Sequence, residues 1–96
     1  MAGERTTRVA NLIRAEISNL LLTATNDARL SRVIITDVRV SGDLRHAKVF
    51  FTIIGEDGAE KAREEAEAAL ESAVSFFRRH LGKGLRMKHT PSLVFL

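Results

Sequence analysis

The 96-residue chain contains no cysteine, no tryptophan and no tyrosine, and it has a single proline. Without cysteine, disulfide bonds cannot stabilise the fold, and both thiol catalysis and cysteine-ligated metal sites are excluded. No apolar run approaches the roughly 20 residues that a helix needs to cross a bilayer. Residues 1–16 also lack the basic-then-apolar order of a signal peptide. These absences predict a cytoplasmic protein that does not enter a membrane.

The residues that are present indicate a folded domain. Apolar residues make up 45% of the chain and charged residues 28%, a balance typical of globular rather than disordered or fibrous proteins. Chains of this length seldom divide, so we expect a single domain over residues 1–96, ordered from about residue 5.

Charge is distributed unevenly along the chain, although the net value is only +3. Residues 56–71 contain seven acidic and two basic side chains, whereas residues 76–89 contain five basic side chains and no acid. An acid-free basic segment of this length favours an anionic partner, above all a nucleic acid.

The first half of the chain predicts a helix followed by a hairpin. Thr6 or Thr7 is expected to cap a helix that runs to about Thr25, with one apolar stripe. That stripe comprises Val9, Ile13, Ile17, Leu20 and Ala24. Alternating runs at 32–40 and 45–54, joined by a turn at 41–43, predict two antiparallel strands. In the first strand, we expect residues 34, 36, 38 and 40 on one face and residues 33, 35, 37 and 39 on the other. In the second, we expect residues 47, 49, 51 and 53 on the core face and residues 46, 48, 50 and 52 on the opposite face.

The second half predicts helices and a last strand. Asp57 is expected to cap an acidic, alanine-rich helix, and the character changes abruptly near Ala73-Val74-Ser75. Either the helix breaks there, with Ser75 capping a short helix that ends at a left-handed Gly82, or it continues without interruption. Residues 85–96 predict a last strand interrupted by Pro91, which should therefore lie at a sheet edge or carry a bulge there. The prediction is an α+β fold in the order α-β-β-α-(kink)-α-β, with helices on one face of a three-stranded sheet.

No pattern in the sequence supports catalysis. The three histidines stand without metal-ligand spacing, and no base accompanies a nucleophilic serine. The carboxylates of Glu64, Glu65 and Glu67 are typical of an exposed helix face. The segment 55–58 formally matches a nucleic-acid-clamping GxxG loop, but its acidic centre favours a simple turn. We therefore predict no enzyme activity, no metal and no cofactor.

The basic segment predicts an RNA-binding surface. Its cations would lie close together around a short helix and its exit, while Phe76, Phe77 and Leu81 anchor that helix in the core. The candidates are Arg78, Arg79, Lys83, Arg86 and Lys88, with Arg5, Arg8, Arg45 and Lys48 as outlying members. Phe50 falls on the hairpin face opposite the main apolar stripe, and the sequence leaves its burial open.

Three segments resemble the ribosome-binding factor A family. They are RVANLIRAEISNLL at 8–21, VRVSGDLRHAKVFF at 38–51 and LGKGLRMKHTPSLVF at 81–95. The resemblance extends from about Arg5 to Leu96, and its most specific part is the S-x-D-L-x-x-A-K-V core of the middle segment. It implies a single KH type II-like RNA-binding domain in which an Ala-x-Gly kink replaces the GxxG loop. Here Ala73-Val74-Ser75 occupies the kink, with serine in place of glycine.

The resemblance also implies a function. Family members bind the free 30S small ribosomal subunit near the 5′ region of 16S rRNA, late in its assembly. They assist precursor rRNA processing and growth in the cold, and they act as monomers alongside other assembly factors, including a ribosome-associated GTPase. The family usually continues past the last strand, so we expect residues 1–96 to correspond to the family's domain without its C-terminal tail.

Three alternatives remain open on the residues alone. The chain could be a KH-like module for another RNA, a small α/β hydrolase of phosphate esters or acyl phosphates, or a domain that binds only proteins through its acidic helix. Co-sedimentation with small subunits, turnover by the pure protein and affinity for rRNA distinguish these possibilities.

Overall fold

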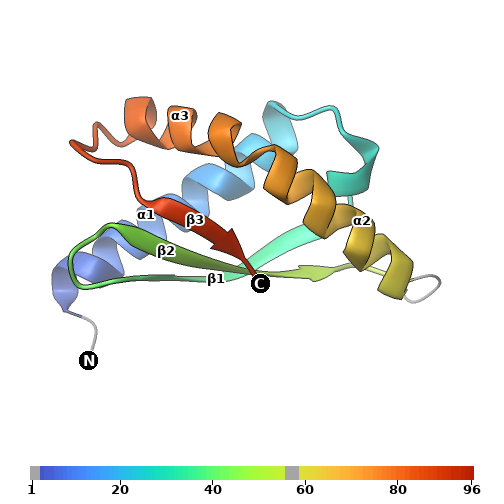
Figure 1. Ribbon diagram of the computed structural model, residues 1–96, viewed down its shortest axis with the longest axis horizontal. Helices are drawn as coiled ribbons and strands as arrows, with labels where there is room; N and C mark the ends of the chain where they lie inside the picture. Colours follow the sequence, from blue (N-terminus) through green and yellow to red (C-terminus); the bar gives the residue numbers. More distant parts are fainter. Residues whose placement is uncertain (1–2, 56–58) are drawn as a thin grey trace.

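Six main elements follow one another in a computed structural model that describes residues 3–55 and 59–96 (Figure 1). They are α1 (Glu4–Thr23), β1 (Val33–Val40), β2 (His46–Ile53), α2 (Ala59–Ser72), α3 (Val74–Gly84) and β3 (Ser92–Phe95). A short 3-10 helix, η1 (Ala28–Leu30), lies in the connection before β1. The predicted order of helices and strands is confirmed.

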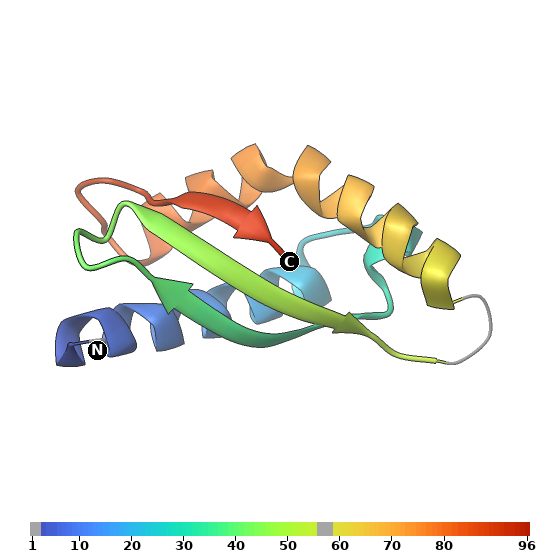
Figure 2. The same ribbon diagram turned by 60° about the horizontal axis from the view of Figure 1, so that its bottom comes forward.

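The three strands form one sheet in the order β1-β2-β3. β1 and β2 are antiparallel, whereas β2 and β3 are parallel. In Figure 2 the strands lie in front, with α1 running along β1 and the α2–α3 pair running along β3. The helices therefore cover one face of the sheet and leave the other face open.

The core lies between that covered face and the helices. Ile13 and Ile17 of α1, Val49 of β2 and Phe77 of α3 are completely buried. β2 alternates as predicted, because Ala47, Val49 and Phe51 are buried whereas the residues between them are more exposed. Of the predicted stripe of α1, Ile13, Ile17 and Leu20 are buried and Val9 is half-buried. Ala24 is exposed, because the helix ends at Thr23, one residue before it. No helix in the described part of the chain is long and apolar enough to cross a membrane.

The predicted faces of β1 are wrong beyond its midpoint. Ile35 lies opposite Phe51 but Asp37 lies opposite Phe50, so the register shifts at Thr36. A β-bulge adds one residue to a strand and reverses the side-chain alternation after it. The core face consequently takes Val33 and Ile35 before the bulge and Val38 after it.

The start of α1 also differs from the prediction. Gly3, rather than Thr6 or Thr7, is the N-cap residue, and no side chain caps the helix. The Thr6 hydroxyl instead donates a hydrogen bond to the Gly3 carbonyl at 2.8 Å and is buried. The predicted Asp57 cap lies outside the described residues.

The helix break occurs at Ala73, between the last residue of α2 and the first of α3. Ser75 lies inside α3 and does not cap it, because the N-cap is Ala73 and no side chain bonds there. Gly82 does not end α3 either. It lies in the helix interior, where a Cβ would stand 2.9 Å from the Thr90 hydroxyl oxygen. Close packing against the following loop, rather than a left-handed conformation, explains the glycine at this position.

The last strand is shorter than predicted. Residues 85–91 form a turn and an irregular lead, and only Ser92–Phe95 pair with β2. Pro91 is buried immediately before the strand, where its missing N–H interrupts no ladder. The predicted edge position is confirmed by the strand order.

Candidate nucleic-acid interface

Three segments that are distant in the sequence meet around a hollow of about 400 Å³ at one end of the molecule. They are the start of α1, the β1–β2 turn and the loop between α3 and β3, which lie together at the left of Figure 1. The lining residues are Arg5, Val9, Asp43, Leu44, Arg45, Arg86, Met87, Lys88 and His89. We call this hollow the basic concavity, because four of its side chains are arginine or lysine and one is a carboxylate.

The β1–β2 turn holds Arg45 through a fixed set of hydrogen bonds. The Ser41 hydroxyl and the Arg45 amide donate to one oxygen of the Asp43 carboxylate, at 2.7 and 3.0 Å. These bonds, the Ser41 bond first, hold the pKa of Asp43 below its usual value. The carbonyl of Arg45 in turn accepts a hydrogen bond from the Ser92 amide at 2.8 Å. The backbone of Arg45 is therefore attached to both the turn and β3.

Arg86 occupies a strained position at the end of α3. Its φ of 52° lies in the left-handed region, immediately after the C-cap residue Leu85. Glycine is the residue most often found there, because a Cβ is disfavoured in that conformation. The chain has glycines at 82 and 84 but places an arginine at this position. A strained residue that lines a concavity is a reason to consider a functional role.

None of the nine predicted RNA-binding cations forms an ion pair with a described residue. The ion pairs present in the described part of the chain join Arg29 to Asp27, Arg39 to Asp37 and Arg63 to Glu67. In the basic concavity, the carboxylate of Asp43 accepts hydrogen bonds from the turn and pairs with no cation of the described residues. The guanidinium and ammonium groups of Arg5, Arg45, Arg86 and Lys88 are consequently open to an external anion.

Helix α3 presents a second group of predicted cations. Arg79 and Lys83 lie one helical turn apart on an exposed face. Arg78 is different, because its guanidinium donates to the carbonyls of Pro91 and Thr90, both at 3.1 Å. Arg78 thereby joins α3 to the lead into β3, and two of its donors are not available to a ligand.

The remaining predicted cations are Arg8 and Lys48. Arg8 is exposed on α1, one turn beyond Arg5. Lys48 lies in β2 between the buried Ala47 and Val49, so its side chain is on the open face of the sheet. The structure therefore does not bring Lys48 together with the basic concavity.

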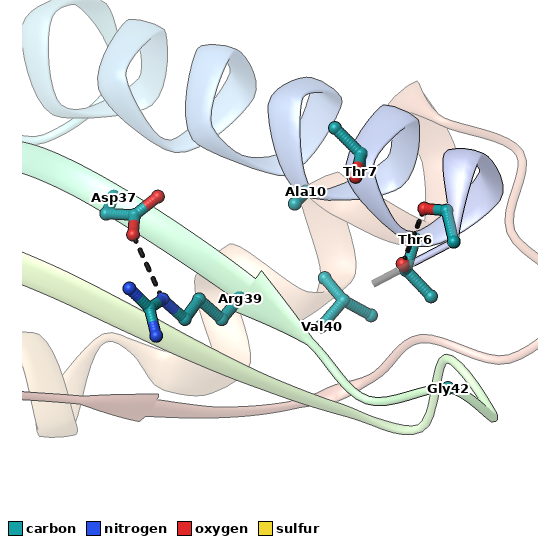
Figure 3. A pocket seen from close by; sticks show the side chains of 8 residues that line it. Thr6, Thr7, Ala10, Asp37, Arg39, Val40 and Gly42 are labelled. Carbon is teal, nitrogen blue, oxygen red and sulfur yellow. Dashed lines mark hydrogen bonds and ion pairs between the residues drawn. The ribbon is translucent and has the colours of Figure 1, made fainter. Parts of the chain in front are cut away.

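A second hollow, of about 470 Å³, lies between the start of α1 and the end of β1 (Figure 3). Thr6, Ala10, Asp37 and Arg39 are among its lining residues. Its two charged groups are paired with each other, because Arg39 Nε lies 3.2 Å from a carboxylate oxygen of Asp37. This hollow consequently lacks the unpaired positive charge of the basic concavity.

The arrangement is suited to binding phosphates. Clustered arginine and lysine side chains neutralise phosphate groups, and arginine can contact them with two parallel hydrogen bonds. Within the described residues, no group of three His, Asp or Glu side chains is placed to hold a metal. Sequence reasoning missed Val9, Leu44, Met87 and His89 as members of this surface. Met87 and His89 could have been found as neighbours of Arg86 and Lys88, and Leu44 from its position beside the predicted turn, whereas Val9 joins them only through a tertiary contact.

Comparisons with known proteins agree with this architecture. A model of the family described as "Ribosome-binding factor A" matches residues 5–96. A ribosome-binding factor A from Heliobacterium modesticaldum is 47% identical over 96 residues, which is 100% of this chain and 77% of that protein. A crystal structure of ribosome-binding factor A from Thermus thermophilus is 24% identical, with a TM-score of 0.79 over 95% of this chain and 93% of that chain.

The Thermus thermophilus protein has also been placed on a ribosomal particle. A homology model of that protein has been fitted into a cryo-EM map of its complex with 30S. It is 26% identical, with a TM-score of 0.72 over 90% of this chain and 87% of that chain. These matches confirm the predicted KH type II-like α+β fold and the predicted resemblance. The chain belongs to the ribosome-binding factor A family.

Proposed function

We propose that this protein binds the free 30S ribosomal subunit and assists its late maturation in the cytoplasm. The observation that carries the proposal is the basic concavity. In it, four cations that form no ion pair within the described part of the chain come together from three segments, and the one carboxylate, that of Asp43, accepts hydrogen bonds within the β1–β2 turn. Membership of the family and the 30S complex of a Thermus thermophilus relative support this choice of partner.

We further propose that the protein holds the 5′ region of 16S rRNA in a conformation that permits precursor processing, which matters most in the cold. Phosphate neutralisation positions a protein on folded RNA without reading individual bases. The protein would act as a monomer and a non-catalytic factor, alongside other assembly factors such as a ribosome-associated GTPase. No cofactor is needed for this role.

The proposed RNA contact has a centre and a periphery. Arg5, Arg45, Arg86 and Lys88 form the centre, because they share the basic concavity. Arg8, Arg79 and Lys83 would extend the contact along α1 and α3. Arg78 supports the surface through its bonds to the loop carbonyls, with Ala73-Val74-Ser75 setting the direction of α3. Lys48 would contact RNA only if rRNA also reaches the open face of the sheet.

Co-sedimentation with purified free 30S subunits tests the proposal. The double variant Arg45→Gln/Lys88→Gln should weaken binding about tenfold or more, because two phosphate contacts are lost. It should also reduce the slope of log affinity against log salt concentration by about 1.4–1.8. Arg14→Gln/Lys61→Gln, which removes the same charge from exposed sites outside the concavity, is the matched control.

Equal affinity of the two double variants for 30S would contradict the assignment of the concavity. Failure of the unaltered protein to bind free subunits, with tight binding to an unrelated folded RNA, would instead favour the general KH-like module. Arg79→Gln/Lys83→Gln should produce a smaller loss than the concavity variant, because these side chains lie at the periphery.

A further inference from the structure

Among the described residues, β3 forms one edge of the sheet and pairs with no second strand. The strand order is β1-β2-β3, so β3 has β2 on one side only. The Ser92 amide donates to the Arg45 carbonyl at 2.8 Å, and the Leu96 amide donates to the Val49 carbonyl at 2.9 Å. Alternate residues of a parallel strand bond to the same neighbour. The backbone N–H and C=O groups of Leu93 and Phe95 therefore point away from β2, toward the open edge.

A groove of about 260 Å³ follows this edge. Leu93, Val94 and Phe95 form one side, and Glu67, Glu71 and Val74 form the other, where α2 meets α3. Figure 2 shows the α2–α3 pair running beside β3. The groove thus offers free backbone hydrogen-bonding groups, an apolar floor and an acidic wall.

The negative charge on the helical side of the groove favours a positively charged ligand. Glu67 and Glu71 are both exposed. Glu67 is partly neutralised by Arg63 at 3.2 Å, whereas Glu71 has no ion-pair partner among the described residues. Helix α2 contains five glutamates against two basic residues.

We infer that this groove binds an extended, lysine- or arginine-rich segment of another protein, which adds a strand to β3. Main-chain hydrogen bonds to Leu93 and Phe95 would supply affinity, as they do wherever a peptide extends a sheet. Alternate side chains of the segment would reach Glu67 and Glu71, while those between them would cover Val94, which is 51% exposed. RNA is disfavoured there, because two carboxylates repel phosphate. The inference uses a surface separate from the basic concavity and does not depend on the proposed function.

Nuclear magnetic resonance titration of the isotope-labelled protein tests the inference. The probe is a synthetic eight-residue peptide of alternating lysine and valine. It should shift the amide signals of Leu93 and Phe95 and slow their hydrogen exchange. Glu67→Gln/Glu71→Gln should weaken binding roughly tenfold, since each exposed ion pair contributes modestly. Glu64→Gln/Glu65→Gln removes the same charge from the same helix outside the groove and should bind as the unaltered protein does.

Several results would overturn the inference. Shifts scattered along α2 without any change at Leu93 and Phe95 would show general attraction to acidic charge. Equal losses in the two double variants, or equal binding of a peptide of alternating glutamate and valine, would lead to the same conclusion. Shifts of the two amides by a short oligouridylate would assign the groove to RNA. Because no ribosomal subunit takes part, a negative result leaves the proposed function standing.

Discussion

Arg86→Gly is expected to stabilise the fold and to weaken RNA binding at the same time. The φ of Arg86 is 52°, and a left-handed conformation costs a residue with a Cβ about 1–2 kcal/mol. Glycine avoids that cost but loses about 0.5–1 kcal/mol through the greater freedom of the unfolded chain. The expected net gain is about 0.5–1 kcal/mol in the free energy of unfolding, or about 2–8 °C in Tm.

Circular dichroism during urea and thermal denaturation measures this gain, since the chain has no tryptophan or tyrosine for fluorescence. In parallel, loss of one cation from the basic concavity should make the salt dependence of RNA affinity about 0.7–0.9 less steep in the log–log plot. Arg86→Lys keeps both the charge and the strained backbone, so it should change neither quantity greatly. Leu44 is the other non-glycine residue of the described part of the chain with a positive φ, 62°, so Leu44→Gly should stabilise the fold without removing a charge.

The two measurements refute different steps of the reasoning. A lower free energy of unfolding for Arg86→Gly would show that the left-handed backbone is not strained as described. An unchanged salt dependence would show that Arg86 does not contact phosphate. A gain in stability together with a loss of RNA affinity would mean that the arginine is retained for binding at the expense of the fold.

Two further predictions concern the surroundings of the concavity. Arg78→Lys should lower the free energy of unfolding by about 1 kcal/mol, because lysine cannot replace both hydrogen bonds to the loop carbonyls, while Arg79→Lys should have no effect on thermal denaturation. Asp43→Asn should raise RNA affinity about two- to fivefold in a filter-binding assay, because an amide oxygen still accepts the turn hydrogen bonds but the negative charge is gone. Since the pKa of Asp43 lies below its ordinary value of 3.8, its contribution to stability is complete above that value and is lost as pH falls through the lowered pKa. Acid titration of the hairpin amides should show this loss in the unaltered protein and not in Asp43→Asn.

The fold was predictable wherever one periodicity applied without interruption. β2 alternates strictly from His46 to Ile53, and its buried face was predicted correctly. β1 was not, because the bulge at Thr36 depends on pairing with β2 and leaves no separate mark in the sequence. The predicted end of α3 was wrong for a related reason. Gly82 is the residue that local rules favour for a left-handed cap, but tertiary packing against Thr90 uses it inside the helix.

The sequence predicted which cations belong to the candidate site, but not which of them the fold brings together. Arg86 and Lys88 are close in sequence, so their shared position followed from the basic segment. Arg5 and Arg45 join them only because the start of α1 and the β1–β2 turn meet the loop before β3. Lys48, three residues after Arg45, lies instead on the open face of the sheet. Proximity in sequence is thus a poor guide where a strand begins, since alternation sends neighbouring side chains to opposite faces.

The basic concavity and the acidic surface of α2 are far enough apart to act electrostatically independently of each other. The longest extent of the molecule is 39 Å, and the basic concavity and α2 lie toward opposite ends of it (Figure 1). Exposed charges further apart than about 8 Å are largely screened from each other at physiological salt. The glutamates of α2 therefore cannot neutralise the concavity at a distance, and they do not weaken its attraction for phosphate. They would disfavour any orientation that presses α2 against RNA. In the proposed complex, α2 and the adjoining β3 edge would therefore face away from the phosphates and stay accessible to the proposed protein partner.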